Sequence, residues 1–243
     1  MAKKKTAANK KAKNDSQSLN RIVSTTDNGR DSNKSKGWLI TFEGSEGCGK
    51  TTQIGRIATR FEGLGFNVVV AREPGGTEIG EEIRHLLKFA QPSHGIYPET
   101  ELLLFAASRA QLVREVFLPS LKRGDIVLCD RFLDSTTVYQ GVGRQIATDP
   151  VHMINNFSAG NIIPDVTVVI DLAAEIGFER IMHRVTSTPD RLEQETIGFY
   201  RKVREGYLML AKATPDRFVV VDGTESRERI EERIWDELSQ RII

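Results

Sequence analysis

The sequence predicts a three-layer α/β fold in which a five-stranded parallel sheet is covered by helices on both faces. From Gly37 onward, short apolar runs rich in β-branched residues alternate with segments of helical periodicity, a pattern typical of parallel βα units. The chain has 243 residues, of which 39% are apolar and 28% charged, enough for one sizeable core. Because strands buried on both faces need helices on both sides, we expect a single three-layer domain over residues 37–243.

Five runs are candidate strands: Trp38–Glu43, Asn67–Arg72, Asp125–Asp130, Asp165–Asp171 and Arg217–Asp222. Helical patterns are expected at about residues 50–64, 78–90, 99–122, 150–159, 174–185, 190–212 and 225–241. No internal repeat and no second folded domain is indicated.

Residues 1–36 differ in composition from the rest of the chain. They are largely Lys, Asn, Ser and Thr, which cannot bury enough surface to offset chain entropy, so we expect a disordered basic tail. The tail holds 10 Lys/Arg against 3 acidic residues, and the remainder holds 24 against 30. Such a tail can bind nucleic acid through charge. A solvated extension with no specific partner is the simpler interpretation.

Several function classes are disfavoured by what the sequence lacks. No apolar run is long enough to span a bilayer, and the N-terminus lacks the pattern of a secretory signal, so we expect a cytoplasmic protein without membrane contact. Cys48 and Cys129 cannot form a disulfide framework or a zinc site. The four histidines are scattered, which disfavours a protein-held transition metal.

A phosphate-binding loop of the pattern GxxxxGK[ST] directly follows the first predicted strand and precedes a helix. Its glycines let backbone N–H groups converge on phosphate, Lys50 adds charge toward the β and γ phosphates, and Thr51 offers a hydroxyl to Mg²⁺. The alternatives are a tight turn without a ligand and, for Cys48, a redox role instead of packing. We expect a nucleoside triphosphate with magnesium to contact Gly44, Ser45, Glu46, Gly47, Cys48, Gly49, Lys50, Thr51 and Thr52.

The remaining motifs decide which kind of P-loop protein this is. Neither an [NT]KxD guanine-reading motif nor an LSGGQ-like transporter signature occurs. Arginines do stand near predicted strand ends or loops, and in an open parallel sheet ligands bind beyond the carboxyl ends of the strands. A donor and an acceptor phosphate would explain this positive charge at Arg72, Arg131, Arg184 and Arg191.

The segment 37–243 resembles the bacterial branch of the thymidylate kinase family of P-loop nucleoside-monophosphate kinases. Five blocks in order carry the resemblance: FEGSEGCGKTT, REPGGT, LLFAASR, DRFxxSTxxYQG and DRLEQE. The resemblance implies transfer of the γ-phosphate of MgATP to dTMP, giving ADP and dTDP for dTTP synthesis. It also implies a homodimer, as is common in the family.

The resemblance further implies roles for residues of the acceptor side. Arg72 would clamp the acceptor phosphate with its planar fork, and a surface ion pair with Glu73 is the alternative. Phe105 would stack on thymine, and Arg109, four residues later on one helix face, would contact a base carbonyl. The alternative for Phe105 is simple core packing within the apolar run that starts at Leu102.

The segment after the third predicted strand carries the remaining roles. Asp130 would act on Mg²⁺ through water, and Arg131 would contact the transferring or the acceptor phosphate as a catalytic residue. Ser135, Tyr139 and Gln140 would form the nucleoside site, with Tyr139 against the deoxyribose and Gln140 near the base. Glu46 would face the acceptor sugar or its arginine, and we expect Arg72 to be its partner.

A mobile lid at about residues 183–192 would supply further charge from Arg184 and Arg191. Here the sequence departs from the bacterial pattern, since Thr186–Ser187 replaces a common Arg-Gly and removes one lid arginine. Because the acceptor phosphate is already largely dianionic at neutral pH, catalysis needs alignment and charge stabilisation by Lys50, Arg131 and Mg²⁺ instead of a general base. Two other classes stay open, namely a nucleic-acid-associated ATPase and a pseudokinase serving as an interaction module.

Overall fold

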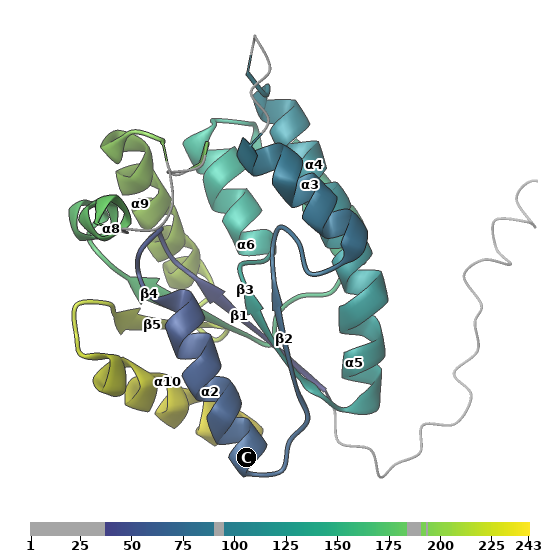
Figure 1. Cartoon of the computed structure of the whole chain (residues 1–243), viewed down its shortest axis with the longest axis vertical. Helices are drawn as coiled ribbons and strands as arrows, with labels where there is room; N and C mark the ends of the chain where they lie inside the picture. Colours follow the sequence, from purple (N-terminus) through teal and green to yellow (C-terminus); the bar gives the residue numbers. More distant parts are fainter. Residues whose placement is uncertain (1–36, 90–94, 184–190, 193) are drawn as a thin grey trace, which may run out of the picture. The chain divides into compact units, whose positions relative to one another are not determined.

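The computed structural model describes residues 37–89, 95–183, 191–192 and 194–243 (Figure 1). The predicted tail, residues 1–36, and Arg184 lie outside them. Within the described residues, five parallel strands form one sheet in the order β2-β3-β1-β4-β5. The predicted fold class is confirmed. The strands are β1 (Trp38–Glu43), β2 (Val68–Arg72), β3 (Ile126–Asp130), β4 (Val166–Asp171) and β5 (Phe218–Asp222).

The register of the sheet brings three functional strand ends together. The central strand β1 pairs with β3, so that Phe42 lies beside Asp130, and β2 pairs with β3, so that Arg72 lies beside Asp130 as well. All strands run in one direction, and their carboxyl ends therefore meet at one edge of the sheet. The loops after β1, β2 and β3 leave from this edge, where an open α/β sheet binds its ligands.

Helices cover both faces of the sheet (Figure 1). Alternate residues of each strand point to opposite faces. On one face Ile40 and Phe42 pack with apolar residues of α2 (Lys50–Gly63) and α10 (Arg227–Ile242). On the other face Leu39 packs with residues of a helical segment formed by α4 (Pro98–Leu112), the π-helical turn η1 (Val113–Phe117) and α5 (Leu118–Arg123).

The remaining helices pack against these elements. They are α3 (Glu78–Phe89) against α4, α7 (Thr148–Ala159) against α4, and α9 (Ile197–Ala213) beside α8 (Ala174–Met182) and the sheet. The predicted helix 190–212 begins only at Ile197, because the Thr196 hydroxyl caps it by accepting from the Phe199 amide at 3.2 Å.

The sequence patterns missed one helical segment, formed by α6 (Leu133–Thr136) and the π-helical turn η2 (Thr137–Gly143). Its β-branched residues and two glycines disfavour a helix locally. Tertiary packing overrides that preference, because Val138 is fully buried against α9, where a Cβ on Gly206 would lie 3.0 Å from the Val138 side chain. Among the helices of the described residues, none is long and apolar enough to cross a membrane.

Candidate active site

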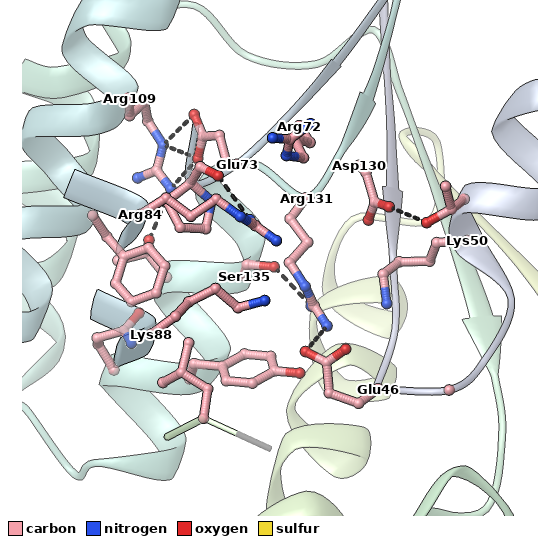
Figure 2. Close-up of a pocket in the computed structure, with 18 of the residues that line it drawn as sticks. Glu46, Lys50, Arg72, Glu73, Arg84, Lys88, Arg109, Asp130, Arg131 and Ser135 are labelled. Carbon is pink, nitrogen blue, oxygen red and sulfur yellow. Dashed lines mark hydrogen bonds and ion pairs between the residues drawn. The ribbon is translucent and has the colours of Figure 1, made fainter. Parts of the chain in front are cut away.

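The loop after β1, the ends of β2 and β3, and the helices α3, α4 and η2 enclose one pocket of about 300 Å³ (Figure 2). Most residues predicted for the site line it: Glu46, Gly47, Gly49, Lys50, Thr51, Thr52, Arg72, Phe105, Arg109, Asp130, Arg131, Ser135, Tyr139 and Gln140. Gly44, Ser45 and Cys48 lie in the phosphate loop behind this lining, and Arg191 lies elsewhere.

The phosphate loop curls because its glycines adopt backbone angles that other residues rarely take. Gly44 and Gly47 have φ of 133° and 73°, and a Cβ on either would come within 2.6 Å of a carbonyl oxygen, of Ile170 or Gly177. The ammonium group of Lys50 donates to the carbonyls of Gly44 at 3.2 Å and Ser45 at 3.0 Å. The loop therefore presents backbone N–H groups, a lysine charge and the N-terminus of α2 in one place, which favours phosphate.

Oxygen ligands suited to magnesium stand beside the loop. The Thr51 hydroxyl donates to an Asp130 carboxylate oxygen at 2.8 Å, and both line the pocket. Among the described residues no group of three or more His, Cys, Asp or Glu could hold a metal ion. This donor set fits Mg²⁺, which takes few protein ligands and fills its shell with phosphate and water.

Arg131 stands between the two ends of the pocket, at the end of β3 (Figure 2). Its φ of 71° lies in the left-handed region, which is strained for a non-glycine residue and persists only where the surroundings hold it. The guanidinium donates to the Gly44 carbonyl at 3.1 Å and to Ser135 and Tyr207 at 3.2 Å each. It also lies 4.9 Å from the centre of the Tyr139 ring.

The partner of Glu46 differs from the prediction. Glu46 pairs with Arg131 at 2.7 Å, and Arg72 instead pairs with Glu81 at 2.8 Å. Burial opposes ionisation of Glu46, but the charges of Arg131 and Lys50 prevail and lower its pKa to about 2. The predicted Glu46–Arg72 pair is therefore wrong, because Glu81 is fixed next to Arg72 by accepting from the Gly76 amide at 2.8 Å. The alternative pairing of Arg72 with Glu73 is wrong as well.

A second carboxylate beneath Arg131 was missed by the sequence patterns. Glu43, fully buried at the end of β1, accepts from the Phe132 amide at 2.8 Å, the Ser135 hydroxyl at 2.6 Å and the Tyr207 hydroxyl at 2.8 Å. Burial, reinforced by Asp134, raises the pKa of Glu43 to about 7. Ser135 and Tyr207 also contact Arg131. Glu43 therefore fixes the two hydroxyl groups that in turn position the Arg131 guanidinium. The sequence did carry a signal for this residue, namely an acidic residue at the end of a mostly apolar strand.

The end of the pocket away from the phosphate loop rests on a buried ion pair. Arg109 on α4 is 1% exposed and pairs with Glu73 at 2.7 Å (Figure 2). It also donates to Asn155 at 2.7 Å and to Thr136 at 2.9 Å. Burial raises the pKa of Glu73, although Arg109 opposes the shift. This network fixes Arg109 rigidly at the pocket wall.

The apolar run on α4 divides among three environments. Leu102 is buried, Leu103 is exposed, and Phe105 is half-buried and lines the pocket beside Arg109, as a base-stacking residue would. Tyr139 and Gln140 line the same end from η2. The buried Tyr139 hydroxyl has no hydrogen-bond partner among the described residues, which marks a polar atom suited to a ligand.

Two basic side chains of α3 join the pocket without having been predicted. Figure 2 shows Arg84 and Lys88 extending toward Arg131, and both line the cavity. They lie four residues apart on one helix face, a spacing that the sequence offered as a signal.

Arg191 lies away from the phosphate loop. Its guanidinium pairs with Glu101 at 2.7 Å and donates to the Leu87 carbonyl at 2.8 Å. The catalytic charge predicted for Arg191 as a lid residue stays a prediction, since these contacts are to α3 and α4.

Comparisons with known proteins agree with this geometry. The family model described as thymidylate kinase matches residues 42–234. The thymidylate kinase of Pelobacter propionicus is 49% identical over 211 residues, covering 85% of this chain and 96% of that protein. The thymidylate kinase of Geobacter sulfurreducens is 47% identical over 210 residues, covering 85% and 98%.

A solved structure is similar as well. The crystal structure of thymidylate kinase from Ehrlichia chaffeensis superposes with a TM-score of 0.67 at 33% identity, covering 84% of this chain and 99% of that one. The chain therefore belongs to the thymidylate kinase family, the enzymes that phosphorylate dTMP to dTDP with ATP.

Proposed function

We propose that the pocket aligns ATP and dTMP on opposite sides of Arg131 for direct transfer of the γ-phosphate. The observation that carries this assignment is the position of Arg131, which contacts the phosphate loop through Gly44 and Glu46 and the proposed acceptor side through Ser135 and Tyr139 at once. A guanidinium at that point can stabilise charge on the phosphoryl group as it moves.

The donor side consists of the phosphate loop from Gly44 to Thr52, with Lys50 as the charged group. Thr51 and, through water, Asp130 would hold Mg²⁺, which would supply positive charge to neutralise the phosphates. Arg184 remains a proposed lid residue outside the described part of the chain.

The acceptor side would bind the three parts of dTMP, namely its phosphate, its sugar and its base. Arg72, half exposed at the end of β2, is free to leave its weak pair with Glu81 and clamp the phosphate, joined by Arg84 and Lys88. Tyr139 and Ser135 lie where the sugar would sit, and Phe105, Arg109 and Gln140 surround the base. No side chain needs to remove a proton, since the acceptor phosphate is already largely ionised at neutral pH.

Turnover tests the proposal directly. The full chain with ATP, Mg²⁺ and dTMP is expected to form ADP and dTDP in equal amounts. Turnover of another nucleoside monophosphate without turnover of dTMP would overturn the acceptor assignment. ATP hydrolysis that depends on DNA or RNA, and that is lost when residues 1–36 are removed, would instead support a nucleic-acid-associated ATPase.

A homodimer forms part of the proposal, supported by an exposed apolar face. Met153 and Phe157 lie four residues apart on α7 and are 64% and 81% exposed. Phe157→Asp is expected to convert a dimer into a monomer in light scattering, whereas Leu64→Asp, at an exposed apolar position beyond α2, is the control and should leave the mass unchanged. A monomeric wild type, or a dimeric Phe157→Asp variant, would contradict a dimer interface at this face.

The proposed location is the cytoplasm. ATP is available there, and cysteines such as Cys48 and Cys129, which form no disulfide, stay reduced.

A further inference from the structure

Glu101 is a buried carboxylate whose partners come from two other segments of the chain. It stands in the first turn of α4 with its side chain 2% exposed. One oxygen accepts from the Gln140 amide nitrogen at 2.8 Å and from Arg144 at 3.1 Å. The other accepts from Arg144 at 3.2 Å and forms an ion pair with Arg191, with 2.7 Å between the charged atoms. A buried carboxylate is tolerated only when it is paired in this way, so its partners are held in place together.

The charge of Glu101 determines which way the Gln140 amide faces. Burial opposes ionisation, but the bonds from Arg144, Gln140 and Arg191 prevail and lower the pKa of Glu101. An ionised carboxylate only accepts hydrogen bonds, so Gln140 has to turn its NH₂ group toward Glu101. Its carbonyl oxygen then faces the other way, and no hydrogen bond of a described residue uses that oxygen. Gln140 is itself buried and lines the pocket beside Phe105.

The orientation of this oxygen discriminates between bases. Thymine and uracil carry an N–H donor at N3, between two carbonyls, whereas cytosine has an unprotonated ring nitrogen at N3 and an amino group next to it. An oxygen fixed toward that edge accepts from the first two bases and repels the ring nitrogen of the third. A freely turning amide would accommodate all three.

We propose that Glu101 is a positioning residue that sets the polarity of base recognition by holding the Gln140 carbonyl oxygen toward the nucleobase. This inference rests on the proposed function and adds a specificity determinant outside the pocket lining. Glu101 acts through Gln140 and does not itself contact the substrate.

The same carboxylate fastens a wall of the acceptor pocket. Arg191 is bound by Glu101 and by two carbonyls of α3, with its guanidinium on Leu87 at 2.8 Å and its amide on Lys88 at 3.2 Å. The next residue, Leu192, lines the pocket. Arg191 thus serves the acceptor side, and its loss is expected to raise the KM for dTMP and leave the KM for ATP unchanged.

Glu101→Gln tests the inference, because a neutral amide at position 101 can both donate and accept and lets Gln140 turn over. Activity is measured with dTMP, dUMP and dCMP. The kcat/KM for dCMP relative to dTMP is expected to rise by about tenfold or more, the scale of one mispaired buried hydrogen bond. The kcat/KM for dUMP relative to dTMP should stay constant, since both bases carry the N–H group at N3. Glu99→Gln, the same change at an exposed position in the same helical turn, is the matched control and should alter neither ratio.

An unchanged dCMP-to-dTMP ratio in a folded Glu101→Gln variant would overturn the inference. Absence of dTMP turnover in the wild type would instead overturn the proposed function, so the two failures are distinct.

A second measurement, made on the wild-type protein, tests the inference if the Glu101→Gln variant does not fold. The side-chain ¹⁵N amide signal of Gln140, assigned by its absence in Gln140→Met, should keep its shift and exchange protection when dTMP binds. A loss of protection would show that the NH₂ group turns to the base and would contradict the inference.

Discussion

The two ends of the pocket are built in different ways. The proposed donor end is a contiguous loop from Gly44 to Thr51, shaped by glycine backbone angles and by lysine contacts to backbone carbonyls. The proposed acceptor end joins side chains from distant segments through buried ion pairs, such as Glu73 with Arg109 and Glu101 with Arg144. The donor end thus depends on local backbone geometry. The acceptor end depends on paired charges, where removal of one partner leaves the other buried and uncompensated.

Arg131 joins the two ends, and its loss is expected to have the largest effect. Arg131→Ala should lower kcat with ATP and dTMP by a factor on the order of 10² to 10⁴, the range for a charge-stabilising group. Steady-state kinetics measure this change in kcat. Arg229→Ala, which removes an exposed arginine of α10 paired with Glu232, is the control and should retain normal turnover. Near-normal kcat in Arg131→Ala would refute the proposed alignment.

Breaking the buried acceptor-side pair should cost stability as well as substrate binding. Glu73→Gln leaves the buried Arg109 without its counter-charge, so we expect the free energy of unfolding to fall by about 3–5 kcal/mol. Urea denaturation measures the change. A loss below about 1 kcal/mol would mean that the acceptor wall does not depend on this charge.

Two carboxylates three residues apart should respond to pH in opposite directions. The folded-state pKa of Glu43 is raised from 4.5 to about 7, so its stabilising contribution is present below pH 4.5 and is lost as the pH rises through 7. The pKa of Glu46 is lowered to about 2, so its contribution is present above pH 4.5 and is lost as the pH falls toward 2.

Unfolding measured across this pH range separates the two carboxylates. Glu43→Gln is expected to abolish a decline of at most about 3 kcal/mol between pH 4.5 and 7 that the wild type shows. Glu46→Gln should leave that decline in place and reduce the loss of stability in acid. Identical pH profiles for the two variants would contradict the opposite environments.

The exposed pair at the acceptor entrance should contribute least to stability. Arg72 and Glu81 are 52% and 43% exposed, and solvent screens such pairs, so Glu81→Gln should change the free energy of unfolding by less than about 1 kcal/mol. This variant is the exposed counterpart of Glu73→Gln under the same denaturation protocol. If Glu81→Gln lowered the free energy of unfolding as much as Glu73→Gln does, the exposed and buried ion pairs would contribute equally to stability, against this account.

The sequence allowed the strands and the phosphate loop to be predicted well, because both depend on local patterns. Each observed strand ends at the predicted residue, and β2 to β5 each begin one residue later than predicted. Helix η2 was missed because its burial against α9 outweighs the local preference of its β-branched residues and glycines. Tertiary contacts, which spacing along the chain does not reveal, decide such segments.

For the proposed acceptor side, the sequence predicted which residues line the pocket but not which charged side chains pair with each other. Arg72, Phe105, Arg109, Arg131 and Gln140 line the pocket and their roles stay predictions, yet the partner of Glu46 was mistaken and the ion pairs of Glu101 were not anticipated. Charge partners separated by 40 or more positions depend on how strands and helices pack, as the pairing of Glu46 with Arg131, after the neighbouring strands β1 and β3, shows. The contact of Arg191 with Glu101 arises in the same way.

A bisubstrate ligand tests the central claim that one pocket aligns donor and acceptor. Adenosine and thymidine joined through five phosphates should occupy both ends of the pocket together. Calorimetry is expected to show one molecule bound per chain, with binding weakened by excess ATP and, separately, by excess dTMP. Competition with only one of these nucleotides, or two molecules bound per chain, would contradict the alignment around Arg131.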